Sequence, residues 1–355
     1  MNNPAVVVIG PGKSKIIDTP IPKITGENEA IIRIKFGGVC GSDVHFWDDG
    51  AIDGNPVSEK NYLPLGHEAS GTIVSLSPEV KNLSVGDNVA IEPANPCRVC
   101  IRCREGVYNL CPNMKYAASG TEHPGTLTKF FKVPADFCYK LPPHVSLEEG
   151  VLAEPLAVAA HSVRMIGIKP GQSLVIFGAG TIGLVCGAVA KVFGARKIVL
   201  VDILDSKLGF AKGFLDCETF KTTKGADPEA MAAEIIEKFN LSLGADAVIE
   251  ATGAASSTMA CVFVARKGAH FVQTGIGKHI IDYPIFQFSI KELHMHGAFR
   301  HSEGDYRVAM DILENRLVPV KQLITRMYNF EDIESAWTAT LSGKGVKNMV
   351  RGVPE

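Results

Sequence analysis

Ser173-Leu-Val-Ile-Phe177 runs directly into Gly178-Ala-Gly180-Thr181-Ile182-Gly183. The apolar run predicts a buried strand, and the pattern after the glycines predicts a helix over 181–193. The first glycine permits a tight turn, the second lets the backbone approach a pyrophosphate, and the third lets the helix pack against the strand. Because a helix N-terminus also attracts negative charge, this stretch predicts a dinucleotide-binding site.

Asp202 supports that interpretation and indicates which dinucleotide binds. It follows the next predicted strand, at roughly the 20-residue distance at which a carboxylate accepts hydrogen bonds from the adenosine ribose. A 2′-phosphate at about 4 Å from this carboxylate would cost about 4 kcal/mol, and Lys207 is the first cation that follows. We therefore expect NAD rather than NADP. The residues expected to bind it are Gly178, Gly180, Thr181, Ile182, Gly183, Asp202 and Lys207.

Further strands and helices alternate around this stretch. Strands are predicted at 197–201, 245–250 and 268–273, and helices at 228–239 and 256–266. This alternation is typical of a doubly wound parallel sheet.

The residues before about 150 have a different character. Short apolar runs such as Ala30-Ile-Ile-Arg-Ile-Lys-Phe36 and Thr72-Ile-Val-Ser-Leu76 are interrupted by Gly, Pro and Asp, which indicates an all-β region. A chain of 355 residues is long enough for two domains. The last fifty or so residues, with a helical pattern over 305–315, are too few for a third domain, so we expect them to pack onto the first.

Composition limits the class of partner. The 36 Lys and Arg are matched by 38 Asp and Glu, which gives a net charge of -2, and no long basic run indicates nucleic-acid binding. No run of 18 apolar residues indicates a membrane span, and no secretory signal is evident. Nine cysteines, four of them close together, favour reduced thiols and metal binding over disulfides. We expect a cytoplasmic protein with a small-molecule partner.

Two short segments carry ligands for a catalytic metal. Cys40-Gly-Ser-Asp-Val-His45 and Gly66-His67-Glu68-Ala-Ser-Gly71 supply a thiol, an imidazole and a carboxylate. Three protein ligands and one open position make a catalytic zinc site. Each residue alone has an ordinary structural explanation, but glycines bracket both segments and a nucleotide fold follows. Glu154 is a second carboxylate, in an apolar segment where burial would require a partner.

Four more cysteines predict a second metal site. Cys97, Cys100, Cys103 and Cys111 supply four thiolates on one loop, which closes a tetrahedral site with no open position. The spacing also resembles that of an iron–sulfur loop, but no electron-transfer partner site is evident, and the family resemblance described below also implies zinc. We therefore predict a structural zinc ion that orders this loop.

Taken together, these motifs identify a family. The sequence resembles the zinc-containing medium-chain dehydrogenases, most closely their polyol (sorbitol, xylitol and L-arabinitol) dehydrogenase branch. The resemblance extends over nearly the whole chain. It rests on the two metal-ligand segments, the four cysteines, Val85-Gly-Asp-Asn-Val89, Glu154-Pro155-Leu156, Gly178 to Gly183, and Gly297-Ala-Phe-Arg300.

The resemblance implies a fold and an activity. It implies an α/β protein in which a GroES-like β-barrel catalytic domain (1–155, completed by 297–355) lies beside a Rossmann NAD-binding domain (156–296), with the active site between them. It also implies a homo-oligomer, with a tetramer favoured, and two zinc ions per chain. We expect an NAD-dependent enzyme that interconverts a sugar alcohol and its ketose.

Residue roles also follow from the resemblance. Cys40 and His67 would bind the catalytic zinc, with Glu68 or Glu154 as the carboxylate ligand and water mediating one of them. Ser42 matches the residue that relays the substrate proton, and His45 a further relay; zinc-bound water assisted by Glu154 is the alternative route. Phe46, Phe299 and Arg300 match positions that line the substrate site, where a guanidinium can bind several hydroxyls.

Some residues depart from the family pattern. Phe46 and His301 stand where an aromatic hydroxyl is common, Ser77 stands where glycine is usual, and the segment 48–61 is long and polar. Two other functions remain open: oxidation of an amino alcohol, as in L-threonine 3-dehydrogenases, and a nucleotide-binding protein without catalysis. The first usually has Thr at the position of Ser42, and the retained ligands argue against the second.

Overall fold

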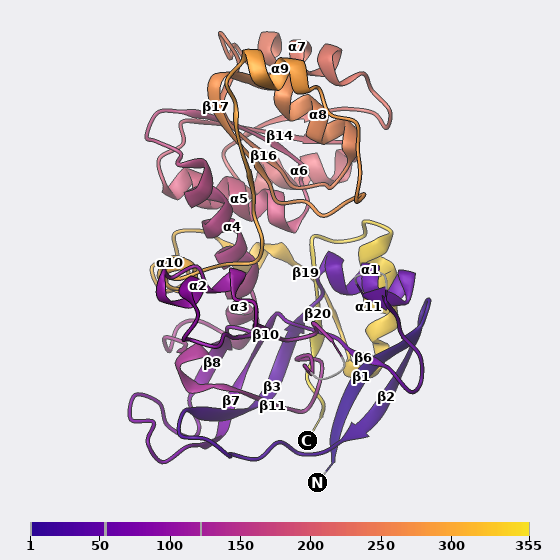
Figure 1. The fold of residues 1–355 in the computed structure, drawn as a ribbon, viewed down its shortest axis with the longest axis vertical. Helices are drawn as coiled ribbons and strands as arrows, with labels where there is room; N and C mark the ends of the chain where they lie inside the picture. Colours follow the sequence, from indigo (N-terminus) through magenta and orange to yellow (C-terminus); the bar gives the residue numbers. More distant parts are fainter. Residues whose placement is uncertain (1, 53–54, 121–122, 355) are drawn as a thin grey trace. The chain divides into compact units, whose positions relative to one another are not determined.

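The computed structural model describes residues 2–52, 55–120 and 123–354 (Figure 1). It divides the chain into two compact units, Met1–Glu154 with Ser302–Glu355, and Pro155–His301. The expected boundaries fell after 155 and after 296. The second lies further along the chain because the residues after 297 continue the ladder of the second unit, where Ala298 N–H donates to the carbonyl of Gln273 at 2.9 Å. Asp53 and Gly54, within the polar segment 48–61, lie outside the described residues.

The second unit is a parallel sheet with helices between its strands. Its strands are β13 (Ser173–Phe177), β14 (Lys197–Asp202), β15 (Glu218–Lys221), β16 (Ala245–Glu250), β17 (Ala265–Gln273) and β18 (His294–Gly297). They lie in the order β15-β14-β13-β16-β17-β18, and every neighbouring pair is parallel. The order reverses between β13 and β16, which is the switch point where doubly wound folds bind their ligands. The predicted doubly wound sheet is confirmed.

Helix α4 (Ala153–Ile166), which begins in the first unit, precedes β13. The helices that connect successive strands are α5 (Thr181–Val192), α6 (Asp205–Phe214), α7 (Pro228–Lys238), α8 (Ala255–Val264) and α9 (Ile285–Ile290). Residues of β13 are all buried, as the uninterrupted apolar run predicted.

The first unit is mainly β. Its strands are β1 (Asn3–Gly10), β2 (Lys13–Thr19), β3 (Glu29–Gly38), β4 (Ala51–Ile52), β5 (Asn55–Pro56), β6 (Leu63–Pro64), β7 (Ala69–Leu76), β8 (Asn88–Ile91), β9 (Ala94–Asn95), β10 (Lys115–Tyr116), β11 (Phe130–Pro134), β12 (Cys138–Lys140), β19 (Ile324–Tyr328) and β20 (Lys347–Arg351). Its largest sheet runs β12-β8-β7-β3-β20-β19, with β11 also paired to β3. Because β20 pairs with β3, the end of the chain belongs to this unit.

Helices occur in this unit as well, although the sequence indicated only strands before residue 150. They are α1 (Gly41–Asp49), α2 (Ile101–Arg104), α3 (Leu147–Val151), α10 (Asp305–Glu314) and α11 (Ile333–Leu341). Helix α1 is stabilised by distant residues, since the ring of Trp47 packs 5.5 Å from the ring of Trp337 in α11. The expectation of an all-β region was wrong here, because this packing cannot be detected from local sequence.

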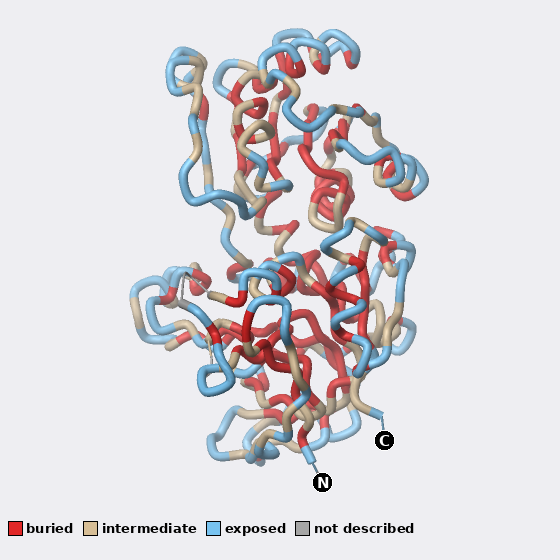
Figure 2. Tube along the Cα trace, turned by 90° about the vertical axis from the view of Figure 1, so that its right-hand side faces the viewer, coloured by how far each residue is buried: buried red, intermediate tan, exposed pale blue. Residues whose placement is uncertain are grey.

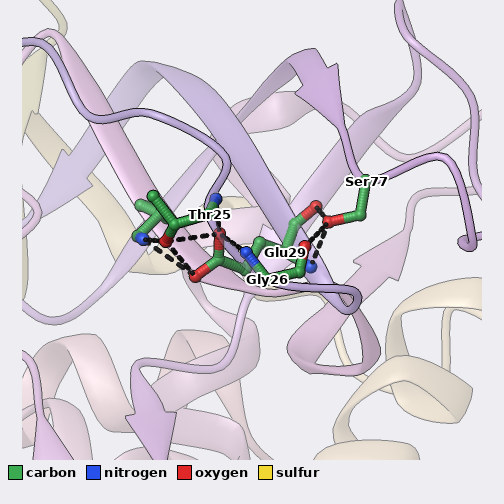
Figure 3. Close-up of polar contacts among 5 residues, drawn as sticks. Thr25, Gly26, Glu29 and Ser77 are labelled. Atoms are coloured by element: carbon green, nitrogen blue, oxygen red, sulfur yellow. Dashed lines mark hydrogen bonds and ion pairs between the residues drawn. The ribbon is translucent and has the colours of Figure 1, made fainter.

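A polar turn leads into the central strand β3 (Figure 3). The Glu29 carboxylate accepts hydrogen bonds from the N–H groups of Thr25 and Gly26 at 2.5 and 3.0 Å, and from Lys132 Nζ at 2.8 Å. The buried Ser77 hydroxyl accepts from Glu29 N–H at 2.9 Å and donates to the Gly26 carbonyl at 2.6 Å. Ser77 stands where the family usually has glycine. Its hydrogen bonds therefore connect this turn to the end of β7.

Each unit has its own buried core. Figure 2 shows buried segments concentrated in the interior of each unit and exposed segments in the connecting loops. Among the described residues, no helix combines the length and the hydropathy needed to cross a membrane.

Candidate functional site

Three metal-binding side chains meet in the first unit. Ligand atoms of Cys40, His67 and Glu68 all lie within 4.8 Å of one another, and His67 and Glu68 are buried. Cys40 immediately precedes α1. Gly66 has φ +96°, and a side chain there would collide with Leu127, so glycine is required for the loop that presents His67. We refer to these three residues as the donor group.

Asp43 and Ser42 support the donor group from the first turn of α1. Asp43, fully buried, places a carboxylate oxygen 3.2 Å from Nδ1 of His67. This position orients the imidazole and leaves its other nitrogen for a metal ion. The Ser42 hydroxyl donates to the Cys40 sulfur at 3.3 Å. Asp43 lies inside the Cys40 to His45 motif, so the sequence contained the signal although we had given Asp43 no role.

Charges around His67 favour a cation. Burial opposes protonation of the ring, but Asp43 and Cys40 outweigh it and raise the pKa of His67 well above its usual value. A divalent ion would supply the positive charge that these groups favour. The donor set of thiol, imidazole and carboxylate therefore fits a zinc ion.

Glu68 has a second partner that the sequence did not reveal. Lys347 Nζ, on β20, donates to both carboxylate oxygens of Glu68 at 2.8 and 2.7 Å and to the Val39 carbonyl at 3.1 Å. Burial raises the pKa of Glu68, and nearby Glu154 adds to the effect, although Lys347 opposes it. The pairing of β20 with β3 brings Lys347 here, across a separation of 279 residues in the chain.

Glu154 is near the donor group but is not one of its members. Its Oε1 accepts a hydrogen bond from the Tyr116 hydroxyl at 2.9 Å, and the Tyr116 ring lies 6.1 Å from the ring of His67. The buried carboxylate therefore has the partner that its apolar surroundings require.

The other predicted residues of α1 differ in exposure. His45 is exposed, and it follows Ser42 by three positions, so both lie on the same side of the helix. Phe46 is half-buried and packs against the hydrophobic core around Trp47 and Trp337.

The four cysteines of the loop 97–111 also converge. Ligand sulfurs of Cys97, Cys100, Cys103 and Cys111 all lie within 4.8 Å of one another. The sulfur of Cys103 is 3.9 Å from that of Cys97 and 3.5 Å from that of Cys100. Four sulfurs bound to one zinc at about 2.3 Å lie roughly 3.8 Å apart, so this spacing fits a zinc ion. Hydrogen bonds from the N–H groups of Cys100 and Val99 lower the pKa of Cys97 to about 6, which favours a thiolate ligand.

This loop is attached to the sheet beside it. Arg98, in a left-handed conformation (φ +66°), makes two hydrogen bonds to the Asp136 carboxylate at 2.6 and 2.8 Å. The Tyr108 hydroxyl donates to the buried Glu92 at 2.5 Å. The Gly106 carbonyl accepts from the hydroxyl of Ser302 at 2.6 Å, which links the loop to the C-terminal segment.

The three glycines of the turn between β13 and α5, in the second unit, each have a different environment. Gly178 has φ +104°, which other residues rarely adopt. A Cβ on Gly180 would have only Lys207 Nζ nearby, at 4.0 Å, so the space above it is open. A Cβ on Gly183 would lie 1.8 Å from the Gly178 carbonyl oxygen, so only glycine permits this packing of α5 on β13. These are the features that a pyrophosphate site needs.

Asp202 lies at the same edge of the sheet. Its carboxylate accepts from Ala179 N–H at 2.8 Å and from Leu204 N–H at 3.0 Å, so it also holds the glycine turn. The end of β16, on the other side of β13, carries a hydrogen-bond network that the sequence motifs did not indicate. There, the buried Glu250 accepts from Gly253 N–H at 2.9 Å and from Gln273 Nε2 at 2.7 Å. The available signal was an acidic residue at the last position of a buried strand.

Phe299 and Arg300 also belong to the second unit. Arg300 lies over the ring of Phe299, 4.6 Å from its centroid, and has φ +59°. Such a conformation is uncommon for arginine and often marks a functional position. Their assignment to the substrate site stays a prediction.

Comparison with known proteins identifies the family. Residues 26–143 match the family described as alcohol dehydrogenase GroES-like domain, and residues 181–315 match the family described as zinc-binding dehydrogenase. D-xylulose reductase A of Aspergillus niger is 44% identical over 351 residues, which are 99% of this chain and 97% of that protein.

Two solved structures of dehydrogenases have a similar fold over nearly the whole chain. L-idonate 5-dehydrogenase from Escherichia coli matches with a TM-score of 0.88 at 27% identity, over 99% of this chain and 98% of that chain. 2R,3R-butanediol dehydrogenase from Bacillus subtilis matches with a TM-score of 0.86 at 26% identity, over 99% of this chain and 100% of that chain.

The chain belongs to the zinc-containing medium-chain dehydrogenases, in their polyol dehydrogenase branch. It is therefore an oxidoreductase. The predicted family and the predicted fold class, a GroES-like domain with a Rossmann domain, are confirmed.

Proposed function

We propose that this protein is an NAD-dependent zinc polyol dehydrogenase that interconverts a secondary alcohol of a sugar alcohol and the corresponding ketose. The observation that carries the proposal is the convergence of Cys40, His67 and Glu68. The 44% identity to D-xylulose reductase A directs the substrate class toward five-carbon polyols such as xylitol.

The zinc ion, NAD and the residues of the chain would have different roles in the reaction. When bound, zinc supplies Lewis-acid chemistry that lowers the pKa of an alcohol, and NAD supplies the hydride acceptor. Cys40, His67 and Glu68 would hold the ion, and Asp43 would orient His67. Ser42 would take the hydroxyl proton of the substrate, and the exposed His45 would pass it to water.

NAD is favoured over NADP by the position of Asp202. Its carboxylate lies beside the glycine turn and is only partly buried, so a 2′-phosphate placed there would meet a negative charge. A structural zinc ion at the four cysteines completes the proposed set of two ions per chain. All nine cysteines are unpaired, which supports the expected cytoplasmic location.

We also propose that the protein is a homo-oligomer, with a tetramer favoured. Exposed apolar residues gather between positions 276 and 299 of the second unit, and large exposed apolar surfaces mark sites of association. They are Ile276, Ile280, Ile285, Phe286, Ile290, Met295 and Phe299.

A kinetic panel tests the substrate and the cofactor. Xylitol, sorbitol, the arabinitols, galactitol and threonine would be compared with NAD and with NADP. We expect turnover of at least one polyol with NAD, and its loss on chelation. Turnover of threonine alone would indicate an amino-alcohol dehydrogenase, and no turnover of any substrate would favour a non-catalytic nucleotide-binding protein.

Two variants test the donor group. Cys40→Ser and His67→Ala should abolish turnover and remove one of the two zinc ions. NAD binding, measured by fluorescence titration, should remain because the glycine turn belongs to the other unit. Unimpaired turnover in either variant would contradict the assignment of these zinc ligands.

A further inference from the structure

Three histidines lie together on the last two strands of the parallel sheet. His270 on β17 is the register partner of His294 on β18, and His296 follows two residues later on the same side of β18. The His270 ring lies 4.7 Å from the ring of His294 and 5.4 Å from the ring of His296. The His270 ring is therefore close to both of the others, and we refer to the three as the histidine row.

Two nitrogens of this row are in direct contact. Nδ1 of His270 lies 3.2 Å from Nε2 of His296, and the planes of the two rings are parallel to within 2°. A hydrogen bond there uses one proton and one lone pair. Two imidazoles bound to one tetrahedral ion at about 2.0 to 2.1 Å place their nitrogens roughly 3.3 Å apart. The present spacing therefore fits, and ring rotations of roughly 35° would aim both lone pairs at one ion in place of that proton.

The rings are also accessible and available as ligands. His294 is exposed, and His270 and His296 are half-buried. Burial, the two neighbouring imidazoles and Lys169 all lower the pKa of His270, so its ring is neutral at neutral pH. Only the neutral ring offers a lone pair to a metal ion. Lys169 also repels a bound cation, which limits the affinity.

We propose that His270 and His296 form a two-ligand surface chelate for a divalent transition-metal ion of the Zn²⁺, Ni²⁺ and Cu²⁺ class, beside the ring of His294. The site is separate from the donor group and from the four cysteines, which belong to the other unit. Imidazole is a preferred ligand of these ions, and two partner strands hold the rings in fixed register. Bound metal would tie the edge strand β18 to β17.

Calorimetric titration with Ni²⁺ tests the proposal. The protein is first loaded with zinc and freed of weakly bound metal until two zinc ions per chain remain, and its zinc content is measured again after the titration. We expect one additional Ni²⁺ ion per chain, with Cu²⁺ bound more tightly than Ni²⁺. His270→Gln and His296→Gln should each weaken this binding by about tenfold or more, because each removes one of two nitrogen ligands. His279→Gln, which changes an exposed histidine outside the row, should bind as the wild type does.

Two further measurements separate chelation from folding. Glutamine keeps a planar polar side chain, so the melting temperature of the variants without added metal should stay near that of the wild type. In the wild-type protein, the electron paramagnetic resonance spectrum of bound Cu²⁺ should show coupling to imidazole nitrogen. If the wild type binds no additional ion, or if the row variants bind it with unchanged affinity, the proposal is wrong.

Discussion

At the scale of single residues, the buried pair of Lys347 and Glu68 should contribute strongly to stability. Their side chains are only 3% and 1% exposed, and the Glu68 carboxylate is held at both oxygens. A charge buried this deeply is tolerated only with a partner. Glu68 therefore depends on Lys347 for its position beside Cys40 and His67.

Replacing Lys347 with methionine should destabilise the protein by about 3 to 5 kcal/mol, because it leaves the Glu68 charge buried without its partner. The double variant Lys347→Met with Glu68→Gln should recover part of this loss. Urea unfolding followed by circular dichroism measures both.

The exposed pair of Lys15 and Glu59 provides the matched control. Its side chains are 39% and 73% exposed, and its atoms lie 3.4 Å apart. Lys15→Met should change the free energy of unfolding by less than about 1 kcal/mol, since water screens such pairs. Equal effects of the two lysine substitutions would show that burial of the Lys347 pair is not what matters.

At the scale of elements, the turn between β13 and α5 contains one glycine that the packing requires and another that we expect cofactor binding to require. A Cβ on Gly183 would collide with the Gly178 carbonyl oxygen at 1.8 Å, whereas a Cβ on Gly180 has only the flexible end of Lys207 nearby. Gly180 also has φ -78°, which alanine adopts without strain.

Gly183→Ala should therefore lower stability by about 1 to 3 kcal/mol or more through overpacking. Gly180→Ala should cost less than about 1 kcal/mol but should weaken NAD binding at least tenfold, because its methyl group occupies the approach of the pyrophosphate. Melting temperature and fluorescence titration with NAD measure the two effects. Full NAD affinity in Gly180→Ala would contradict the placement of the cofactor.

The turn before β3 predicts a dependence of stability on pH. Burial alone would raise the pKa of Glu29, but hydrogen bonds from Lys132, Thr25 and Gly26 outweigh it and lower this pKa from 4.5 to about 2. A carboxylate with a lowered pKa in the folded state contributes stability that is fully present above pH 4.5 and is lost as the pH falls toward 2.

Glu29→Gln should reduce stability at neutral pH by about 1 to 2 kcal/mol, a range that allows for screening of a partly exposed carboxylate. The difference from the wild type should shrink between pH 4.5 and pH 2. Unfolding measured at several pH values checks this, with Glu27→Gln, an exposed neighbour in the same turn, as the control. A difference that does not change with pH would rule out the carboxylate charge as its cause.

How far the elements could be predicted depended on whether their signals were local. The run Ser173 to Phe177 and the glycines after it carry their own pattern, so β13 and the start of α5 were predicted at the correct residues. Helix α1 was not predicted, because its stability comes from Trp337 on α11. Helix α6 and strand β15 were also missed, since α6 has few buried residues and β15 is short.

At the scale of the whole molecule, the site residues with a local sequence motif could be predicted, and those that distant parts of the chain contribute could not. Local motifs pointed to Cys40, His67, Glu68 and the four cysteines, and these residues do converge. Lys347 could not be found in this way, because strand pairing brings it to Glu68 from the far end of the chain.

The proposed oligomer is also a property of the whole molecule, and it depends on an apolar surface that an isolated chain would expose. Ile280 is 88% exposed and Phe286 is 71% exposed, in a segment rich in exposed apolar side chains. Ile280→Asp together with Phe286→Asp should lower the molar mass measured by light scattering, because two buried carboxylates would face each other across a symmetric interface. Leu243→Asp changes a residue that is 84% exposed in the same unit but outside this segment, and it should leave the molar mass unchanged. A monomeric wild type, or a double variant with the wild-type mass, would exclude this surface as the interface.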